Sequence, residues 1–119
     1  MSNRRPLSAD ELAVVQWLLE NAFTGDSNAV DTEAVRRLHV VSQCACGCGS
    51  IEFVERPQGE GAVIVADAMA AWPDGARAGV ILWSRSGELS GLEVYDCTPG
   101  ASMRALTPAL LRTYESGSL

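Results

Sequence analysis

The fold of this chain is decided by the stretch Gly79-Val80-Ile81-Leu82-Trp83-Ser84-Arg85-Ser86-Gly87-Glu88-Leu89-Ser90-Gly91-Leu92-Glu93-Val94-Tyr95-Asp96. Its first part, residues 79–85, is apolar on both faces, which is typical of a central strand. Ser86-Gly87-Glu88 then supplies a tight turn. In residues 89–96, Leu92 and Val94 alternate with Gly91, Glu93 and Tyr95, as expected for a strand with one buried face. Two antiparallel strands, 79–85 and 89–96, are therefore predicted.

Two more strands are predicted before this hairpin, over residues 50–56 and 62–69. In the first of them Ile51 and Phe53 alternate with polar residues, and the turn-forming residues 57–61 separate it from the second. Pro73 and Gly75 end the second strand before residue 79, since proline and glycine disfavour a central strand. We expect the four strands to pair in chain order as an antiparallel meander.

Helices are predicted toward the N-terminus. Ser8-Ala9-Asp10-Glu11 is a capping box, and the apolar residues that follow it recur at helical spacing, so a helix is predicted over residues 8–24. Val30, Ala34 and Leu38 predict a second helix over 28–38, although the Val40-Val41 pair that follows is also compatible with a short strand.

Thr107-Pro108 resembles the start of a short C-terminal helix. The predicted fold is α+β, one domain over residues 1–119, with the two N-terminal helices packed on the four-stranded meander.

Composition excludes several classes of function. The net charge of −6 and the pI near 4.6 oppose nucleic-acid binding, which depends on a basic surface. No stretch approaches the roughly 18 apolar residues of a membrane span. Ser8, Asp10 and Glu11 stand where an export signal would have its apolar core, so we expect a cytoplasmic protein with reduced thiols.

The cysteines Cys44, Cys46 and Cys48 lie within five residues, and Cys97 is the fourth cysteine of the chain. In an extended segment the three sulfurs would share one face, and Cys97 or His39 would complete the four ligands of a zinc site. Against this, strands one and four of a meander lie three spacings apart, about 14 Å at roughly 4.8 Å each. The sequence therefore favours no bound cofactor, with zinc as the alternative.

Two other interpretations of the cluster remain. The cysteines can pack as small apolar side chains beneath a turn in which Gly47 and Gly49 take unusual backbone angles. A thiol enzyme would need a base beside the nucleophile, and His39, the single histidine, lies in no recognisable catalytic pattern. The sequence favours a protein without catalysis.

Glu93 and Tyr95 share one face of the predicted strand 89–96, beside Gly91. They could line a pocket or a partner surface, or they could belong to a solvated polar face of a half-exposed sheet. The candidate binding residues are therefore Glu93 and Tyr95, together with Cys44, Cys46 and Cys48.

Two segments of the chain, Cys46-Gly47-Cys48-Gly49-Ser50-Ile51 and Gly87-Glu88-Leu89-Ser90-Gly91-Leu92-Glu93-Val94-Tyr95, carry a resemblance. The chain resembles a group of small, mainly actinobacterial proteins of unknown function. These proteins have a Cys-Gly-Cys-x-Ser-Ile turn, usually with proline where this chain has Gly49, and a Gly-x-Leu-x-x-Leu-Glu-Val-Tyr strand. The resemblance implies a shared fold and no mechanism.

The predicted function is that of a binding or interaction module acting through its sheet surface. The expected partner is a protein or a small ligand, and a second copy of the chain is also considered. Nucleic acid and membranes are not expected as partners. The alternatives are a zinc-binding protein built on the cysteine cluster and a thiol-dependent enzyme.

Overall fold

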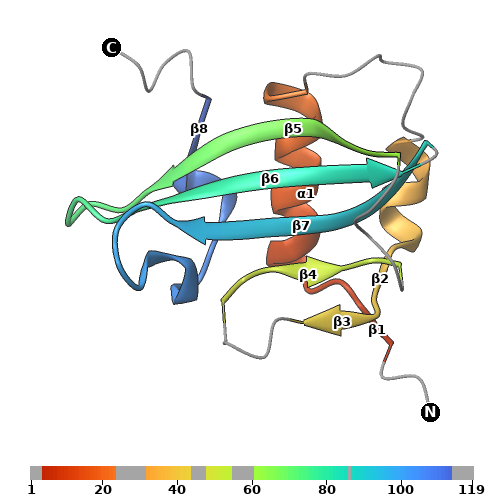
Figure 1. Ribbon diagram of the computed structural model, residues 1–119, viewed down its shortest axis with the longest axis horizontal. Helices are drawn as coiled ribbons and strands as arrows, with labels where there is room; N and C mark the ends of the chain where they lie inside the picture. Colours follow the sequence, from red (N-terminus) through yellow and green to blue (C-terminus); the bar gives the residue numbers. More distant parts are fainter. Residues whose placement is uncertain (1–3, 24–31, 44–47, 55–60, 86, 114–119) are drawn as a thin grey trace.

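The computed structural model describes residues 4–23, 32–43, 48–54, 61–85 and 87–113 (Figure 1). The elements in chain order are β1 (Arg5–Pro6), α1 (Ala9–Asn21), η1 (Thr32–Arg37), β2 (His39–Val40), β3 (Ser42–Gln43), β4 (Ile51–Glu52), β5 (Ala62–Ala71), β6 (Arg77–Arg85), β7 (Glu88–Asp96), η2 (Ala101–Met103), η3 (Pro108–Leu110) and β8 (Leu111–Arg112), where η marks a 3₁₀ helix. Strands dominate the described residues, and α1 is the one α-helix among them.

The strands form two sheets. Six of them make one sheet in the order β3-β4-β7-β6-β5-β8, and β1 pairs with β2 in a separate two-stranded sheet. All of these pairings are antiparallel. The long strands β5, β6 and β7 form the centre of the large sheet, and the two-residue strands lie beside them.

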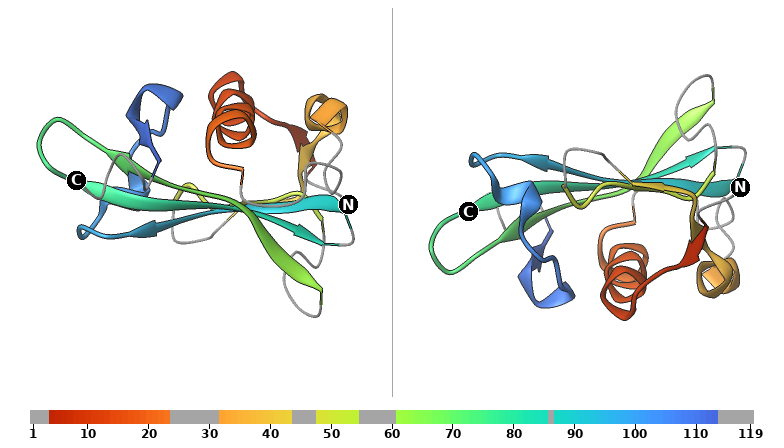
Figure 2. Two further views of the ribbon diagram at one scale, coloured as in Figure 1. Left: turned by 90° about the horizontal axis from the view of Figure 1, so that it is seen from above. Right: turned by 90° about the horizontal axis from the view of Figure 1, so that it is seen from below.

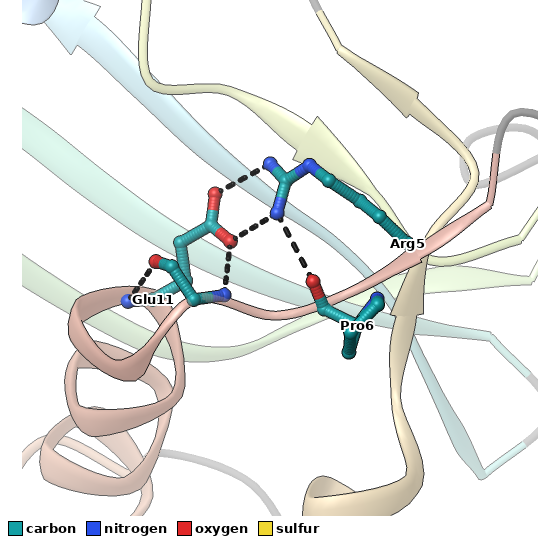
Figure 3. A network of polar contacts seen from close by, with 4 residues as sticks. Arg5, Pro6 and Glu11 are labelled. Carbon is teal, nitrogen blue, oxygen red and sulfur yellow. Dashed lines mark hydrogen bonds and ion pairs between the residues drawn. The ribbon is translucent and has the colours of Figure 1, made fainter.

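The helix α1 begins where the sequence predicted. The Ser8 hydroxyl accepts a hydrogen bond from the Glu11 N–H at 3.1 Å, and the Glu11 carboxylate accepts one from the Ser8 N–H at 2.8 Å, so the capping box is confirmed. Arg5 binds both oxygens of the same carboxylate, at 2.7 and 2.9 Å (Figure 3). This bidentate pair ties β1 to the start of α1. The Arg5 hydrogen bonds are the main cause that lowers the pKa of Glu11 below its ordinary value.

The core lies between α1 and one face of the large sheet. Val14, Val15 and Leu18 of α1 are buried against it. The strand face opposite them includes Ala66, Ala68 and Ala70 of β5, all fully buried, and these small side chains let the helix approach the sheet closely. Figure 2 shows that α1, η1 and the η2–η3 segment all lie on this same side of the sheet. No helix of the described residues is long and apolar enough to cross a membrane.

The prediction of two N-terminal helices is wrong. Residues 24–31 lie outside the described residues, and the rest of the predicted helix 28–38 is the 3₁₀ helix η1 followed by Leu38. A 3₁₀ helix repeats every three residues, and its buried residue is Val35, which accepts a hydrogen bond from the Leu38 N–H through its carbonyl at 3.2 Å. The alternative of a short strand near Val40 is confirmed, because β2 begins at His39.

The four-stranded meander is also wrong. The predicted strand 50–56 is represented by β4, which pairs with β7 and not with β5, in the register Ile51 to Leu92 and Glu52 to Gly91. The predicted hairpin between 50–56 and 62–69 therefore does not exist among the described residues. The prediction that strand 50–56 pairs with strand 62–69 rested on their order in the chain. The pairing of a strand depends instead on where its apolar side chains are buried. Ile51 is buried beside Leu92 of β7.

The remaining long strands agree better with the sequence. β5, β6 and β7 overlap the predicted strands 62–69, 79–85 and 89–96, and β6 pairs with both of the others. The predicted C-terminal helix is only the three-residue η3, after which β8 pairs with Met69 and Ala70 of β5.

Candidate functional site

One face of the large sheet carries no helix of the described residues (Figure 2). On β6, Ala78, Val80, Leu82 and Ser84 are buried toward α1, so the alternate residues Gly79, Ile81, Trp83 and Arg85 lie on the other face. The residues of β5 and β7 that pair with these β6 residues lie on the same face. We call this surface the open face; its central residues are Ile64, Asp67, Met69, Gly79, Ile81, Trp83, Gly91, Glu93 and Tyr95.

The edge of the open face is shaped by a bend in β5. A β-bulge between Ile64 and Ala66 interrupts the pairing with β6. Figure 2 shows the first part of β5 turning away from the helices, toward the open face. Val63 and Ile64 lie there with 53% and 42% of their surfaces exposed, which is unusual for large apolar side chains in a strand.

The ring of Tyr95 covers a glycine of the open face. Gly79 is its cross-strand partner, and a Cβ added at Gly79 would fall 2.0 Å from Tyr95 Cζ. The ring therefore occupies the space where any other residue would place its side chain. Tyr95 nevertheless remains 38% exposed, so its outer side is available for contact. A glycine covered by an aromatic ring on the neighbouring strand is a known device for stabilising sheets.

Glu93 and Trp83 are joined across β6 and β7. The Trp83 indole Nε1–H donates to the Glu93 carboxylate at 3.1 Å, and both side chains are half-buried. Asp67, Ile81 and Glu93 occupy one cross-strand row, so an apolar side chain lies between two acidic ones. The basic side chains Arg77 and Arg85 stand at the two ends of β6. The open face is thus acidic at its centre and basic at the strand ends.

The structure places Glu93 and Tyr95 on the face that the sequence indicated, with Leu92 and Val94 buried on the other. Sequence reasoning missed Gly79, Ile81, Trp83 and Met69 as members of this surface. The apolar character of residues 79–85 on both faces hid the open face. The binding role of Glu93 and Tyr95 stays a prediction.

The cysteine cluster is described only in part. Cys44 and Cys46 lie outside the described residues, while Cys48 is half-buried and Cys97 is exposed. β4 is the direct neighbour of β7, so Cys48, which precedes β4, and Cys97, which follows β7, flank adjacent strands. The separation of about 14 Å expected from three strand spacings therefore does not apply.

His39, the other candidate zinc ligand, lies on β2 with its Nδ1 3.0 Å from the Arg37 carbonyl oxygen. In the part of the chain that the structure describes, no group of three or more His, Cys, Asp or Glu side chains is gathered around a possible metal position. Zinc binding and thiol chemistry both stay predictions.

The residues after the cluster attach β4 to β7. The Gly49 N–H donates to the Ser102 carbonyl at 2.9 Å, and the Ser50 hydroxyl donates to the Val94 carbonyl at 3.1 Å and accepts from the Val94 N–H at 2.9 Å. Gly49 does not adopt a positive φ, so the prediction of an unusual backbone angle is wrong there; Gly47 lies outside the described residues. A Cβ at Gly49 would meet Val94 Cγ2 at 3.3 Å, so the glycine provides space.

Trp72 anchors the turn between β5 and β6. Its N–H donates to the Ala76 carbonyl at 3.0 Å, and its half-buried ring packs against the core. The Arg104 guanidinium lies 5.6 Å from the ring centroid and binds Asp74 at 2.8 Å. These contacts give Trp72 the role of a turn anchor.

Comparisons of the chain with protein-family models, with curated proteins and with solved structures found no match. The resemblance to the small actinobacterial proteins therefore stays a prediction. A function for this chain has to come from the chemistry of its own surfaces, and the open face carries an ordered arrangement of aromatic and acidic side chains.

Proposed function

We propose that the protein is a non-catalytic interaction module whose open face binds a polypeptide that presents a basic side chain among apolar ones. The observation that carries this proposal is the arrangement on the open face: the Tyr95 ring covers Gly79, and Glu93 is held by Trp83. Ordered aromatic side chains lose little conformational entropy on binding, which is why protein interfaces are rich in them.

A polypeptide suits the open face better than a small molecule. Small ligands are bound in concave sites that surround most of their surface, whereas a sheet face offers an extended surface. Ile64, an exposed apolar side chain opposite Trp83 in the register, extends the apolar part of this surface. Apolar contact surface of this kind supplies affinity when it is covered by a partner.

The charge of the open face supports a basic partner. The chain carries a net charge of −6, and Glu93 lies at the centre of the face. Long-range attraction raises the association rate of an oppositely charged partner, and a cation beside Glu93 would add a charge-assisted hydrogen bond. Two copies of the chain stacked through this face would instead bring their Glu93 carboxylates into one desolvated interface, which costs free energy.

The exposed Cys97 is a free thiol, which supports the cytoplasm as the compartment in which the module acts.

The test selects a random peptide library on the immobilised protein and measures the affinities of the enriched peptides. We expect enriched peptides to combine arginine or lysine with aromatic or aliphatic residues. Glu93→Arg should lower the affinity for these peptides by at least about tenfold, which corresponds to the loss of one charge-assisted contact. Tyr95→Ala should also lower the affinity for these peptides, although it leaves the net charge of the protein unchanged.

The matched control is Glu20→Arg, which makes the same change in net charge at an exposed position on α1. Peptide affinity should stay within about twofold in this control, because exposed charges far from the site are screened. Equal losses in both charge variants would contradict the proposal and indicate attraction by net charge alone. A concentration-dependent dimer that Tyr95→Ala abolishes would also overturn it, since the occupant would then be a second copy.

A further inference from the structure

A cavity of about 460 Å³ lies outside the open face, where η1 and β2 approach the turn between β6 and β7 (Figure 1). Its volume falls within the range of roughly 300–1,000 Å³ that small-molecule sites occupy. β7 contributes to both surfaces, with Glu88 and Leu89 at the cavity and Glu93 and Tyr95 on the open face.

Basic side chains gather at this cavity although the chain is acidic. The cavity is lined by Arg4, Arg37 and His39. The chain has nine arginines and one histidine, so three of these ten side chains lie at one cavity. The pairing of β1 with β2 explains how Arg4 arrives there, because successive side chains of an extended segment point to opposite sides. Arg5 is directed to Glu11 at the helix start, and its neighbour Arg4 is directed to the cavity.

The imidazole of His39 is oriented by the backbone. A carbonyl oxygen only accepts, so the 3.0 Å contact with the Arg37 carbonyl is a hydrogen bond when Nδ1 carries the hydrogen. This contact fixes the ring beside Arg37, and Nε2 is the nitrogen left for a ligand. The two arginines supply planar forks that match the oxygens of a carboxylate or phosphate.

The inner wall of the cavity is apolar. Phe53 and Leu89, which are 7% and 5% exposed, belong to the core and also line the cavity. The Phe53 N–H donates to the Ser90 carbonyl at 3.0 Å, which holds this wall against the start of β7. Glu88 is the one acidic side chain among the described residues of the lining, and it lowers the net positive charge that Arg4 and Arg37 give the site.

From this arrangement we propose that the cavity binds a small amphipathic organic anion, with its charged group at Arg4, Arg37 and His39 and its apolar body against Phe53 and Leu89. The charged group is an oxyanion, a carboxylate or a phosphate monoester. The site is separate from the open face, so the inference does not depend on the proposed interaction with a polypeptide.

Two fluorescent probes of matched shape test the proposal. Anilinonaphthalene sulfonate carries an anion on an apolar body, and N-phenylnaphthylamine carries the same body without charge. We expect the sulfonate to bind the folded protein one to one and about tenfold more tightly than the neutral probe, since one charge-assisted contact is worth that much. Decanoate and decyl phosphate are then added as competitors, and the stronger one identifies the oxyanion.

Variants locate the binding site. Arg37→Gln and His39→Gln should each weaken the sulfonate about threefold to tenfold and leave the neutral probe unchanged. Ala34→Phe, at a half-buried position of the lining, should fill the cavity and weaken both probes. Arg112→Gln, on β8, makes the same charge change as Arg37→Gln at an exposed position outside the lining, and it should leave both probes unchanged.

The proposal is overturned if the two probes bind equally well, or if Arg112→Gln weakens the sulfonate as much as Arg37→Gln does. Sulfonate binding that survives Ala34→Phe in a folded protein would place the dye elsewhere and would also overturn it. The folded state of each variant is checked by its near-ultraviolet circular dichroism, because partly unfolded proteins bind the sulfonate without specificity.

Discussion

At the scale of single residues, Gly79 shows why a glycine is needed in the middle of a central strand. Its φ is not in the positive range that favours glycine, so its role is to leave room for the ring of Tyr95. Glycine normally weakens a strand, because it loses more backbone entropy than alanine on folding and has no side chain to pack. The contact with Tyr95 offsets that loss and keeps the ring on the open face.

The coupling between Gly79 and Tyr95 can be measured with a double-mutant cycle. In the wild-type background, the methyl group of Gly79→Ala displaces the Tyr95 ring, which offsets the gain from removing a glycine. In the Tyr95→Ala background the same substitution should stabilise the protein by about 0.5–1 kcal/mol. We therefore expect a coupling free energy of about 1 kcal/mol from urea unfolding of the four proteins. Additive effects of the two substitutions would show that the ring does not depend on the glycine.

At the scale of elements, the attachment of β4 to β7 depends on a side chain that takes the place of a backbone partner. Pairing begins at Ile51, and the next backbone group, the Gly49 N–H, is directed to η2. The Ser50 hydroxyl then satisfies both the N–H and the carbonyl of Val94. Ser50 and Val94 thus hold β4 beside β7, which gives both residues a structural role.

Removal of this hydroxyl tests the attachment. Ser50→Ala leaves two partly buried backbone groups of Val94 without their partner, so the free energy of unfolding should fall by about 1–3 kcal/mol. Ser42→Ala, at an exposed position on the neighbouring edge strand β3, is the matched control and should change it by less than about 0.5 kcal/mol. Urea titrations followed by circular dichroism give both values. A Ser50→Ala loss no larger than the control would mean that β4 is held by its apolar contacts alone.

At the scale of the whole molecule, three carboxylates link separate parts of the fold. Hydrogen bonds from Arg5 lower the pKa of Glu11, hydrogen bonds from Arg104 and then the Ala76 N–H lower that of Asp74, and hydrogen bonds from Ser102 and then the Gly100 N–H lower that of Asp96. These contacts join β1 to α1, the β5–β6 turn to Arg104, and β7 to η2.

The lowered pKa values predict that the protein loses stability in acid. The unfolded chain takes up protons near the ordinary values of 4.5 for Glu and 3.8 for Asp, whereas the folded protein takes them up only at lower pH. The stabilisation is therefore complete above those values and is lost as the pH falls through the folded-state pKa values. Urea midpoints measured from about pH 6 to about pH 3 should fall, and Asp96→Asn should make the fall shallower. A flat profile over that range would contradict the prediction.

Local patterns were sufficient to predict part of this architecture. The capping box at Ser8 and Glu11 specified the start of α1, because its hydrogen bonds join residues three apart. The alternation of Leu92 and Val94 with Glu93 and Tyr95 specified which side of β7 is buried. Strands of two residues, such as β3 and β8, are too short to show any period, so pattern reasoning could not find them.

The sequence by itself determined the long strands, the first helix and the division of β7 into a buried and an open side, since each depends on neighbours close in the chain. Only the tertiary structure decided that β4 pairs with β7, that every described helix covers the same face, and that Trp83 and Glu93 meet on the other. It also brought Arg4, Arg37 and His39 to one cavity. These contacts join residues far apart in sequence, and their partners are selected by burial and hydrogen bonding across the whole molecule.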